Sequence, residues 1–208
     1  MAWFTRFTRF GDVHLVYAQE KDNSCGIACT MMTVFKINKL SLSTAIHAEK
    51  DVYKVYSKVS GSTYDGSSYS YADHLASTLN KLSVGTWIAK YVGPSSVAQT
   101  VLDKVGTVSA VRGPTIFVKP IIVLLEWTDG PGAHFVVVDT VRTAAGKKYA
   151  TVCDPWDGHV HVTRLQKGKT LAYTGAKVPL SWDLGGKRHE YAKATPGETN
   201  GWVVCRQS

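Results

Sequence analysis

Residues 19–32 read QEKDNSCGIACTMM, a polar turn that leads directly into an apolar segment. Small capping residues precede Cys25, and apolar residues such as Ile27 and Met31 follow it at helical spacing. The pattern predicts a helix over residues 25–36 with a cysteine in its first turn. The positive end of the helix dipole and the unpaired first-turn N–H groups favour a thiolate there. Because a thiolate is a nucleophile, the stretch indicates cysteine chemistry.

Length and composition are typical of a folded domain. The chain has 208 residues, of which 44% are hydrophobic and 19% are charged, so it is long enough to bury a substantial core. Its longest aliphatic run, residues 121–125, is far too short to cross a bilayer. The N-terminus alternates aromatic and basic side chains and lacks the apolar core of a signal peptide. We therefore expect one domain over residues 1–208, without a transmembrane segment or a Sec signal.

The cysteines indicate a reducing compartment. Cys25, Cys29, Cys153 and Cys205 are too few and too irregularly spaced to form a disulfide framework. Cys153 and Cys205 lie in apolar runs, so they are expected to be buried free thiols. We expect the protein to act in a reducing cytoplasm.

The chain carries a formal net charge of +8, and the excess is concentrated toward its C-terminus. From Arg164 onward, eight basic side chains face three acidic ones. Such a surface favours an acidic partner, a nucleic acid or an anionic membrane, and it fits a solubilising face at least as well. The sequence contains no helix-turn-helix, zinc-finger or aromatic ribonucleoprotein pattern, so no direct nucleic-acid motif supports nucleic-acid binding.

The chain changes character near residue 113. Helical periodicity dominates before this point, and strand patterns dominate after it, most of them separated by Gly, Pro and Asp turns. The predicted helices cover residues 25–36, 44–56, 71–82 and 97–105. The predicted strands cover residues 115–119, 121–127, 134–142, 148–153, 159–163 and 202–206. Helices followed by strands predict an α+β fold with an antiparallel sheet.

Two loops and one helix cap are also predicted. Ser70 is expected to cap the third helix, with Asp73 three residues on. Residues 57–70 form a loop rich in Ser, Gly and Tyr, and its tyrosines either contact a substrate or belong to a simple connection. The tyrosines in and beside this loop are Tyr64, Tyr69 and Tyr71. Residues 185–200 are expected to form a polar, basic loop before the last strand.

A histidine and an aspartate complete a set for cysteine catalysis. A catalytic thiolate needs an imidazole that moves the proton and a group that orients the imidazole. His134 opens a predicted strand, and Asp154 follows the strand 148–153. If the two strands pair in a hairpin, both side chains lie at the same end. Each residue alone reads as an ordinary strand end or an Asp-Pro turn, but together with Cys25 they predict a catalytic triad.

Gln19 is the candidate oxyanion donor. It lies six residues before Cys25, so a loop can return its carboxamide beside the thiol. Its side-chain N–H groups and the Cys25 backbone N–H would then donate to the developing oxyanion. Asp139 and Asp157 are the alternatives to Asp154 as third member, and Asp139 is less favoured because it lies on the same strand as His134.

These motifs together resemble a known superfamily. Gln19, the run SCGIAC at residues 24–29, the strand that begins HFVVV at His134, and Asp154 followed by Pro155 are similar to those of papain-like cysteine peptidases. The closest likeness is to the bacteriocin-processing peptidases that cut double-glycine leaders, and it spans roughly residues 15–160. The resemblance implies a two-lobed fold, with a helical lobe over about 20–112, a β lobe over about 113–208 and the active site between them.

The resemblance also implies roles for the residues. Cys25 is the nucleophile, and Cys29 faces the core one turn further along the helix. The bacteriocin-processing peptidases are usually fused to a membrane exporter, whereas this chain has no membrane-spanning segment. Free-standing domains of this type resemble bacterial toxin or effector proteases that a secretion system delivers. The implied partners are a protein substrate, acidic or nucleic-acid-associated, and an immunity or inhibitor protein that occludes the cleft.

Three other functions remain open at this stage. A zinc site could use Cys25, Cys29, His159 or His161, but no close Cys/His spacing supplies four ligands, so we expect no metal and no cofactor. The same triad also serves amidases, deamidases and acyltransferases that act on peptidoglycan or on a host protein. A catalytically idle binding module is the alternative outside enzymes, and the complete set of competent residues argues against it.

Overall fold

The computed structural model describes residues 3–38, 46, 48–105, 113–114, 119–156, 158–174 and 196–207. Most of the predicted strand 115–119, residues 185–195 of the predicted loop, and Asp157 lie outside the described residues. The α-helices are α1 Cys25–Ile37, α2 Glu49–Ser60, α3 Ala72–Lys81 and α4 Val97–Val105, with a 3₁₀ turn at Pro94–Ser96. The strands are β1 Trp3–Phe7, β2 Asp12–Tyr17, β3 Trp87–Tyr91, β4 Gly113–Pro114, β5 Ile121–Trp127, β6 Ala133–Ala144, β7 Lys147–Asp154, β8 His159–Leu165, β9 Ala172–Thr174 and β10 Pro196–Arg206.

The fold is α+β, as predicted, and its strands form two sheets. Among the described residues, the large sheet has the order β3-β10-β5-β6-β7-β8, with β9 paired to β10, and all its pairings are antiparallel. The small sheet has the order β1-β2-β4, in which β1 and β2 are antiparallel and β4 is parallel to β2. The predicted hairpin of β6 and β7 is confirmed.

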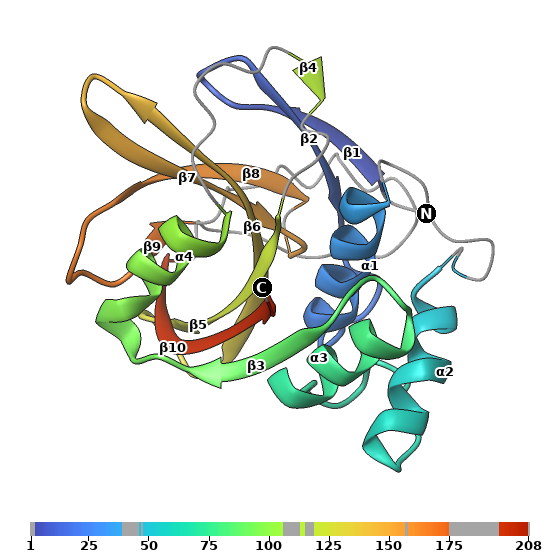
Figure 1. Ribbon diagram of the computed structural model, residues 1–208. Coiled ribbons are helices and arrows are strands. Elements are labelled where there is room, and N and C mark those ends of the chain that lie inside the picture. Colours follow the sequence, from blue (N-terminus) through green and yellow to red (C-terminus); the bar gives the residue numbers. More distant parts are fainter. Residues whose placement is uncertain are drawn as a thin grey trace.

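Helices cover both faces of the large sheet (Figure 1). On one face α1 packs against Phe135 and Val137 of β6 in the first core cluster, α3 packs against β3 and β10, and α2 packs against these two helices. On the other face α4 packs against Val136 and Val138 in the second cluster. This arrangement follows from the alternation of side chains along a strand. Because β6 is buried on both faces, its residues 135–138 are a continuous apolar run.

Helix α1 lies at the centre of the first core cluster. Nearly all of its residues are buried, so its apolar side chains contact the sheet on one side and the other two helices on the other. Gly26 permits one of these contacts, because a Cβ at this position would collide with Ser70 Oγ and with Leu75. The N-terminal end of α1 is therefore held tightly between the sheet and the start of α3.

Several sequence-based boundaries were wrong. Strands β1, β2 and β3 precede residue 113, where only helices were predicted, and β9 was not predicted. Residues 196–200 belong to β10 and not to a loop, and α2 begins at Glu49 and continues to Ser60. Ser70 does not cap α3, because the N-cap is Tyr71. The errors at β3 and β9 share a cause. Both strands are short, and each gains its hydrogen bonds from β10, which is more than 20 residues distant in sequence for β9 and over 100 for β3.

Candidate active site

Cys25 is the first residue of α1, as predicted. The preceding Ser24 is fully buried, and its hydroxyl bonds the backbone of Lys21, which closes the turn before the helix. Cys25 is 8% exposed, whereas the other three cysteines are completely buried. All four are free thiols. Cys25 is therefore the cysteine of this chain that is nearest to solvent, and it lies at the positive end of a helix.

Burial also separates Cys29 from Cys25. Cys29 lies one helical turn further along α1, and burial raises the pKa of its thiol well above the usual value. Burial similarly raises the pKa of Cys153 and of Cys205. Thiols with raised pKa values are poor nucleophiles at neutral pH. The structure therefore supports the expectation that these three cysteines are packing residues.

His134 and Asp154 meet as the hairpin predicted. Nε2 of His134 lies 2.6 Å from Oδ1 of Asp154, and both side chains are at most 2% exposed. The Cys25 thiol lies close enough to His134 to contribute to the raised pKa of the imidazole. Since Nε2 is engaged with the carboxylate, Nδ1 is the ring nitrogen available to the sulfur. The imidazole therefore lies between thiol and carboxylate, which is the order that a cysteine triad needs.

The charges of the three groups favour an ionised histidine. Burial by itself lowers the pKa of His134, but the carboxylate of Asp154 and the sulfur of Cys25 raise it to about 10. Burial acts to raise the pKa of Asp154, whereas the His134 charge and hydrogen bond bring it below its usual value. A charged imidazole beside a carboxylate is a stable proton donor for a leaving group.

Three residues that the sequence did not indicate contact His134 or Asp154. The Tyr173 hydroxyl donates to Oδ2 of Asp154 at 2.6 Å, and the Trp156 backbone N–H donates to Oδ1 at 2.8 Å. The indole of Trp127 stacks on the His134 ring, with centroids 5.1 Å apart and planes 18° apart. These contacts hold the His134 imidazole and the Asp154 carboxylate in a fixed orientation. Trp127 ends β5 opposite the start of β6, and this register was the only signal that could have identified it.

Gln19 lies beside the triad, but its carboxamide is engaged in the turn. Its backbone N–H donates to the carbonyl of Pro155 at 2.8 Å, which joins the start of the loop to the Asp154 turn. Its side-chain Nε2 donates to the carbonyls of Lys21 and Asp22 at 2.8 and 3.0 Å. The structure therefore places the Gln19 backbone against the Asp154 turn, and both protons of its side-chain amide stabilise the turn that precedes Cys25.

The tyrosines of the 57–70 region divide into two groups. Tyr64 is 5% exposed, and its hydroxyl donates to the Asn23 carbonyl, so it supports the loop before Cys25. Tyr69 and Tyr71 are 64% and 63% exposed, on either side of Ser70, which lies against Gly26. Only these two are placed to meet a ligand near Cys25.

A separate polar cavity does not include the triad. It has a volume of about 380 Å³ and lies between the β1–β2 turn and strands β8 and β9. Its lining includes His161 and Tyr173, and the hydroxyl of Tyr173 contacts Asp154 from this side. Cys25 and His134 do not line it, so the chemistry of the triad does not take place there.

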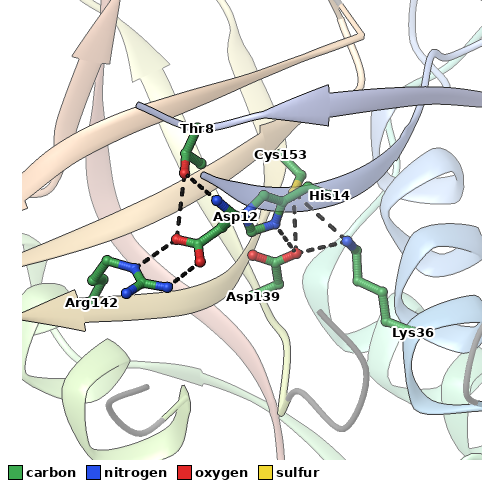
Figure 2. Close-up of polar contacts among 7 residues, drawn as sticks. All are labelled: Thr8, Asp12, His14, Lys36, Asp139, Arg142 and Cys153. Carbon is green, nitrogen blue, oxygen red and sulfur yellow. Dashed lines mark hydrogen bonds and ion pairs between the residues drawn. The ribbon is translucent and has the colours of Figure 1, made fainter. Parts of the chain in front are cut away.

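Among the described residues, one buried cluster has side chains that could bind a metal ion, and the ammonium group of a lysine lies against it. Ligand atoms of His14, Asp139 and Cys153 lie within 4.8 Å of one another. Lys36 Nζ, however, lies 2.7 Å from the same Asp139 carboxylate, and Coulombic attraction raises the pKa of Lys36 despite its burial (Figure 2). The lysine therefore stays charged and supplies the positive charge that a cation would bring. His14 Nδ1 lies 3.0 Å from the same carboxylate.

The contacts of Asp139, the alternative third member of the triad, lie in the same cluster. Its carboxylate contacts Lys36 and His14, on the face of β6 that packs against α1. Asp154, not Asp139, is the carboxylate that contacts His134. His161, which we considered as a zinc ligand, lies with its ring 4.9 Å from that of Tyr173.

No family model and no curated protein sequence matches the chain. None of the helices in the described residues has the length and apolar character needed to cross a membrane.

Glu49, a buried carboxyl group below the Cys25 loop, yields a prediction about stability. Glu49 is fully buried and accepts hydrogen bonds from the Glu20 N–H and the Tyr53 hydroxyl. Burial raises its pKa from 4.5 to about 7, although these hydrogen bonds act to lower it. The folded state therefore holds a proton that the unfolded state releases between about pH 4.5 and 7. Over this range its contribution to the free energy of unfolding should decrease by roughly 3 kcal/mol as pH rises.

Glu49→Gln should remove this pH dependence. Urea unfolding at about pH 5 and pH 8 measures it, because the difference between the two free energies should shrink in the variant by up to roughly 3 kcal/mol. Glu126→Gln is the control, since Glu126 is exposed on β5. Equal pH slopes for Glu49→Gln and the unchanged protein would show that Glu49 is ionised throughout.

Proposed function

We propose that this protein is a cysteine endopeptidase with a papain-like, two-lobed architecture. The observation that carries the proposal is the position of His134, whose Nε2 lies 2.6 Å from Oδ1 of Asp154 and whose imidazole is close enough to the Cys25 thiol for the thiol to help raise its pKa. A nucleophile on a helix end, a charged imidazole and a buried carboxylate are the groups that acyl transfer through a thioester requires. Because no family model or curated protein matches the chain, this geometry is the main support for the proposed function.

The proposed reaction has two halves, acylation of Cys25 and hydrolysis of the acyl-enzyme, and His134 transfers a proton in each. The Cys25 sulfur attacks the peptide carbonyl, and an S–C bond forms as the carbonyl oxygen becomes an oxyanion. His134 then gives its proton to the departing amine as the C–N bond breaks, which leaves an acyl-enzyme. Water then gives a proton to His134 as its oxygen attacks the thioester carbon, and the C–S bond breaks. This releases the carboxylic acid product and restores the Cys25 thiolate beside the His134 imidazolium. Asp154 orients the imidazole throughout.

The Cys25 backbone N–H and the Gln19 carboxamide are the proposed oxyanion donors. In the free protein both protons of the Gln19 amide bond turn carbonyls, so one of them must turn toward the oxyanion when it forms. Gln19→Ala should then lower kcat on the order of 10²–10³-fold with little change in KM. Steady-state kinetics on a cleaved peptide measure this. A rise in KM with unchanged kcat would show that Gln19 acts on substrate binding and not on the oxyanion.

The proposed context is that of a toxin or effector protease acting in a reducing cytoplasm. The four free cysteines agree with a reducing compartment, and the net charge of +8 favours acidic or nucleic-acid-associated protein substrates. An immunity protein that occludes Cys25 and His134 would protect the producing cell. Delivery through a secretion system is part of the same proposal.

Mapping of new protein N-termini tests the proposal. The protein and its Cys25→Ala variant are expressed in the same bacterial host, and N-terminal peptides are compared by mass spectrometry. We expect new termini with the unchanged protein alone, sharing a recognisable sequence around the cut. An absence of new termini, together with a substrate modified at an amide or an acylated side chain, would replace the endopeptidase with an amidase, deamidase or acyltransferase.

A further inference from the structure

A buried ion pair joins α1 to β6 at the end of the helix away from Cys25. Lys36 Nζ lies 2.7 Å from Asp139 Oδ2, and both side chains are at most 2% exposed. His14 Nδ1 lies 3.0 Å from the same oxygen, and the Cys153 thiol donates to it at 3.4 Å (Figure 2). Elements β2, α1, β6 and β7 therefore converge on one carboxylate, and the proposed reaction uses none of these four side chains.

Stability alone is a weak reason for such a pair. Taking two charges out of water has a large free-energy cost, and apolar side chains of similar volume often stabilise a core equally well or better. The best-attested use of a buried polar contact is to define the register between two elements. Apolar contacts let a helix slide or rotate on a sheet with little loss, whereas a hydrogen-bonded ion pair is directional.

The register between α1 and β6 determines how Cys25 meets His134. Eleven residues separate Cys25 from Lys36 along α1, which is about 16 Å and about three complete turns, so both side chains lie on the same face. Five residues separate His134 from Asp139 along β6, which is also about 16 Å. The helix and the strand are in extensive contact. They are thus joined at both ends, by the thiol–imidazole contact at one and by the ion pair at the other.

We infer that Lys36 and Asp139 are positioning residues that set the axial and rotational position of α1 on β6, and thereby the contact between Cys25 and His134. This inference rests on the proposed function. Loss of the pair frees the far end of the helix to shift along the strand. Because Cys25 lies on the same rigid helix, the shift displaces the sulfur from the imidazole by a similar amount. A displacement of about 1 Å is enough to reduce catalysis by on the order of 10²-fold.

The test needs no substrate. Alkylation of Cys25 by iodoacetamide is followed by mass spectrometry of the Cys25 peptide from about pH 5 to pH 9.5. In the unchanged protein the His134 imidazolium should keep alkylation fast even at about pH 5, as thiolate–imidazolium pairs do. The double variant Lys36→Met/Asp139→Asn removes both charges and retains an acceptor for His14. We expect the alkylation rate of this double variant at about pH 5 to be on the order of 10–100-fold lower than that of the unchanged protein. At about pH 9.5, where a thiol ionises without help, the two proteins should be alkylated at the same rate.

A second ion pair on β6 supplies the matched control. Arg142 pairs with Asp12, which joins β6 to β2, and neither residue belongs to α1. Arg142→Met/Asp12→Asn should therefore leave the alkylation profile unchanged, with urea unfolding of both double variants showing how much stability each loses. Equal loss of low-pH alkylation in the two double variants would overturn the positioning role, and so would an unchanged profile in Lys36→Met/Asp139→Asn.

A milder variant keeps the inference testable if the double variant does not fold. Lys36→Arg retains the charge but replaces a compact ammonium with a longer, planar group, so it should shift the helix and lower the rate at about pH 5 without abolishing the fold. A profile identical to that of the unchanged protein would then overturn the inference. The proposed function fails in a different way: the unchanged protein itself would lack fast alkylation at about pH 5.

Discussion

Replacing Cys25 with alanine is expected to lower the turnover of a peptide substrate by on the order of 10⁵–10⁶-fold, because it removes the atom that forms the acyl-enzyme. The fold should be retained, since Cys25 is the least buried of the four cysteines and alanine is a good residue for the first turn of a helix. The measurement is kcat/KM on a peptide identified from the mapped cleavage sites, with circular dichroism to confirm the fold.

Cys29→Ala is the matched control for this prediction. Cys29 is on the same helix, one turn away, and is completely buried. Its replacement should leave turnover close to that of the unchanged protein and lower stability slightly, because a small cavity remains in the core. Residual activity in Cys25→Ala comparable to that in Cys29→Ala would exclude Cys25 as the nucleophile.

Replacing Asp154 with alanine is expected to lower kcat by on the order of 10⁴-fold. The side chain of Asp154 accepts hydrogen bonds from His134 and from Tyr173 at 2.6 Å each. Alanine leaves Nε2 of His134 without its acceptor, so the imidazole loses both its orientation and the charge that stabilises its protonated form. The same substitution should lower the pKa of His134, because the Asp154 carboxylate raises it. The alkaline limb of the pH–activity profile should therefore move to lower pH.

Asp154→Asn separates orientation from charge. The carboxamide oxygen can still accept the His134 N–H, so the ring keeps its position but loses the neighbouring negative charge. Activity should therefore fall between that of the unchanged protein and that of Asp154→Ala. Full activity in Asp154→Ala would show that another carboxylate orients His134. Asp157 is a candidate, and it lies outside the described residues.

Local patterns predicted much of this structure. The helix that begins at Cys25, the helix over residues 97–105 and the strand over residues 121–127 agree with the observed elements, the last two to the residue. Periodicity and turn chemistry over a few neighbouring residues determine such elements, so a single sequence contains the information. The adjacency of His134 and Asp154 was predictable for the same reason, since a short turn joins β6 and β7 and leaves few alternative pairings.

Contacts between distant segments were decided only by the tertiary structure. The hydrogen bond from Tyr173 to Asp154 and the convergence of His14, Lys36 and Asp139 join residues whose neighbours in sequence carry no matching signal. Lys36 reads as an ordinary basic residue in the last turn of a helix. Its role as a buried charge depends on Asp139, which is 103 residues away.

The sequence by itself determined which residue types stand at helix and strand ends, and so the order of nucleophile, base and carboxylate along the chain. The tertiary structure decided how far apart they lie and what holds them, including the engagement of the Gln19 amide in its own turn. The physical reason is that caps and periodicity depend on neighbours in sequence, whereas the position of α1 on β6 depends on packing and on buried charges brought together only when the chain is folded.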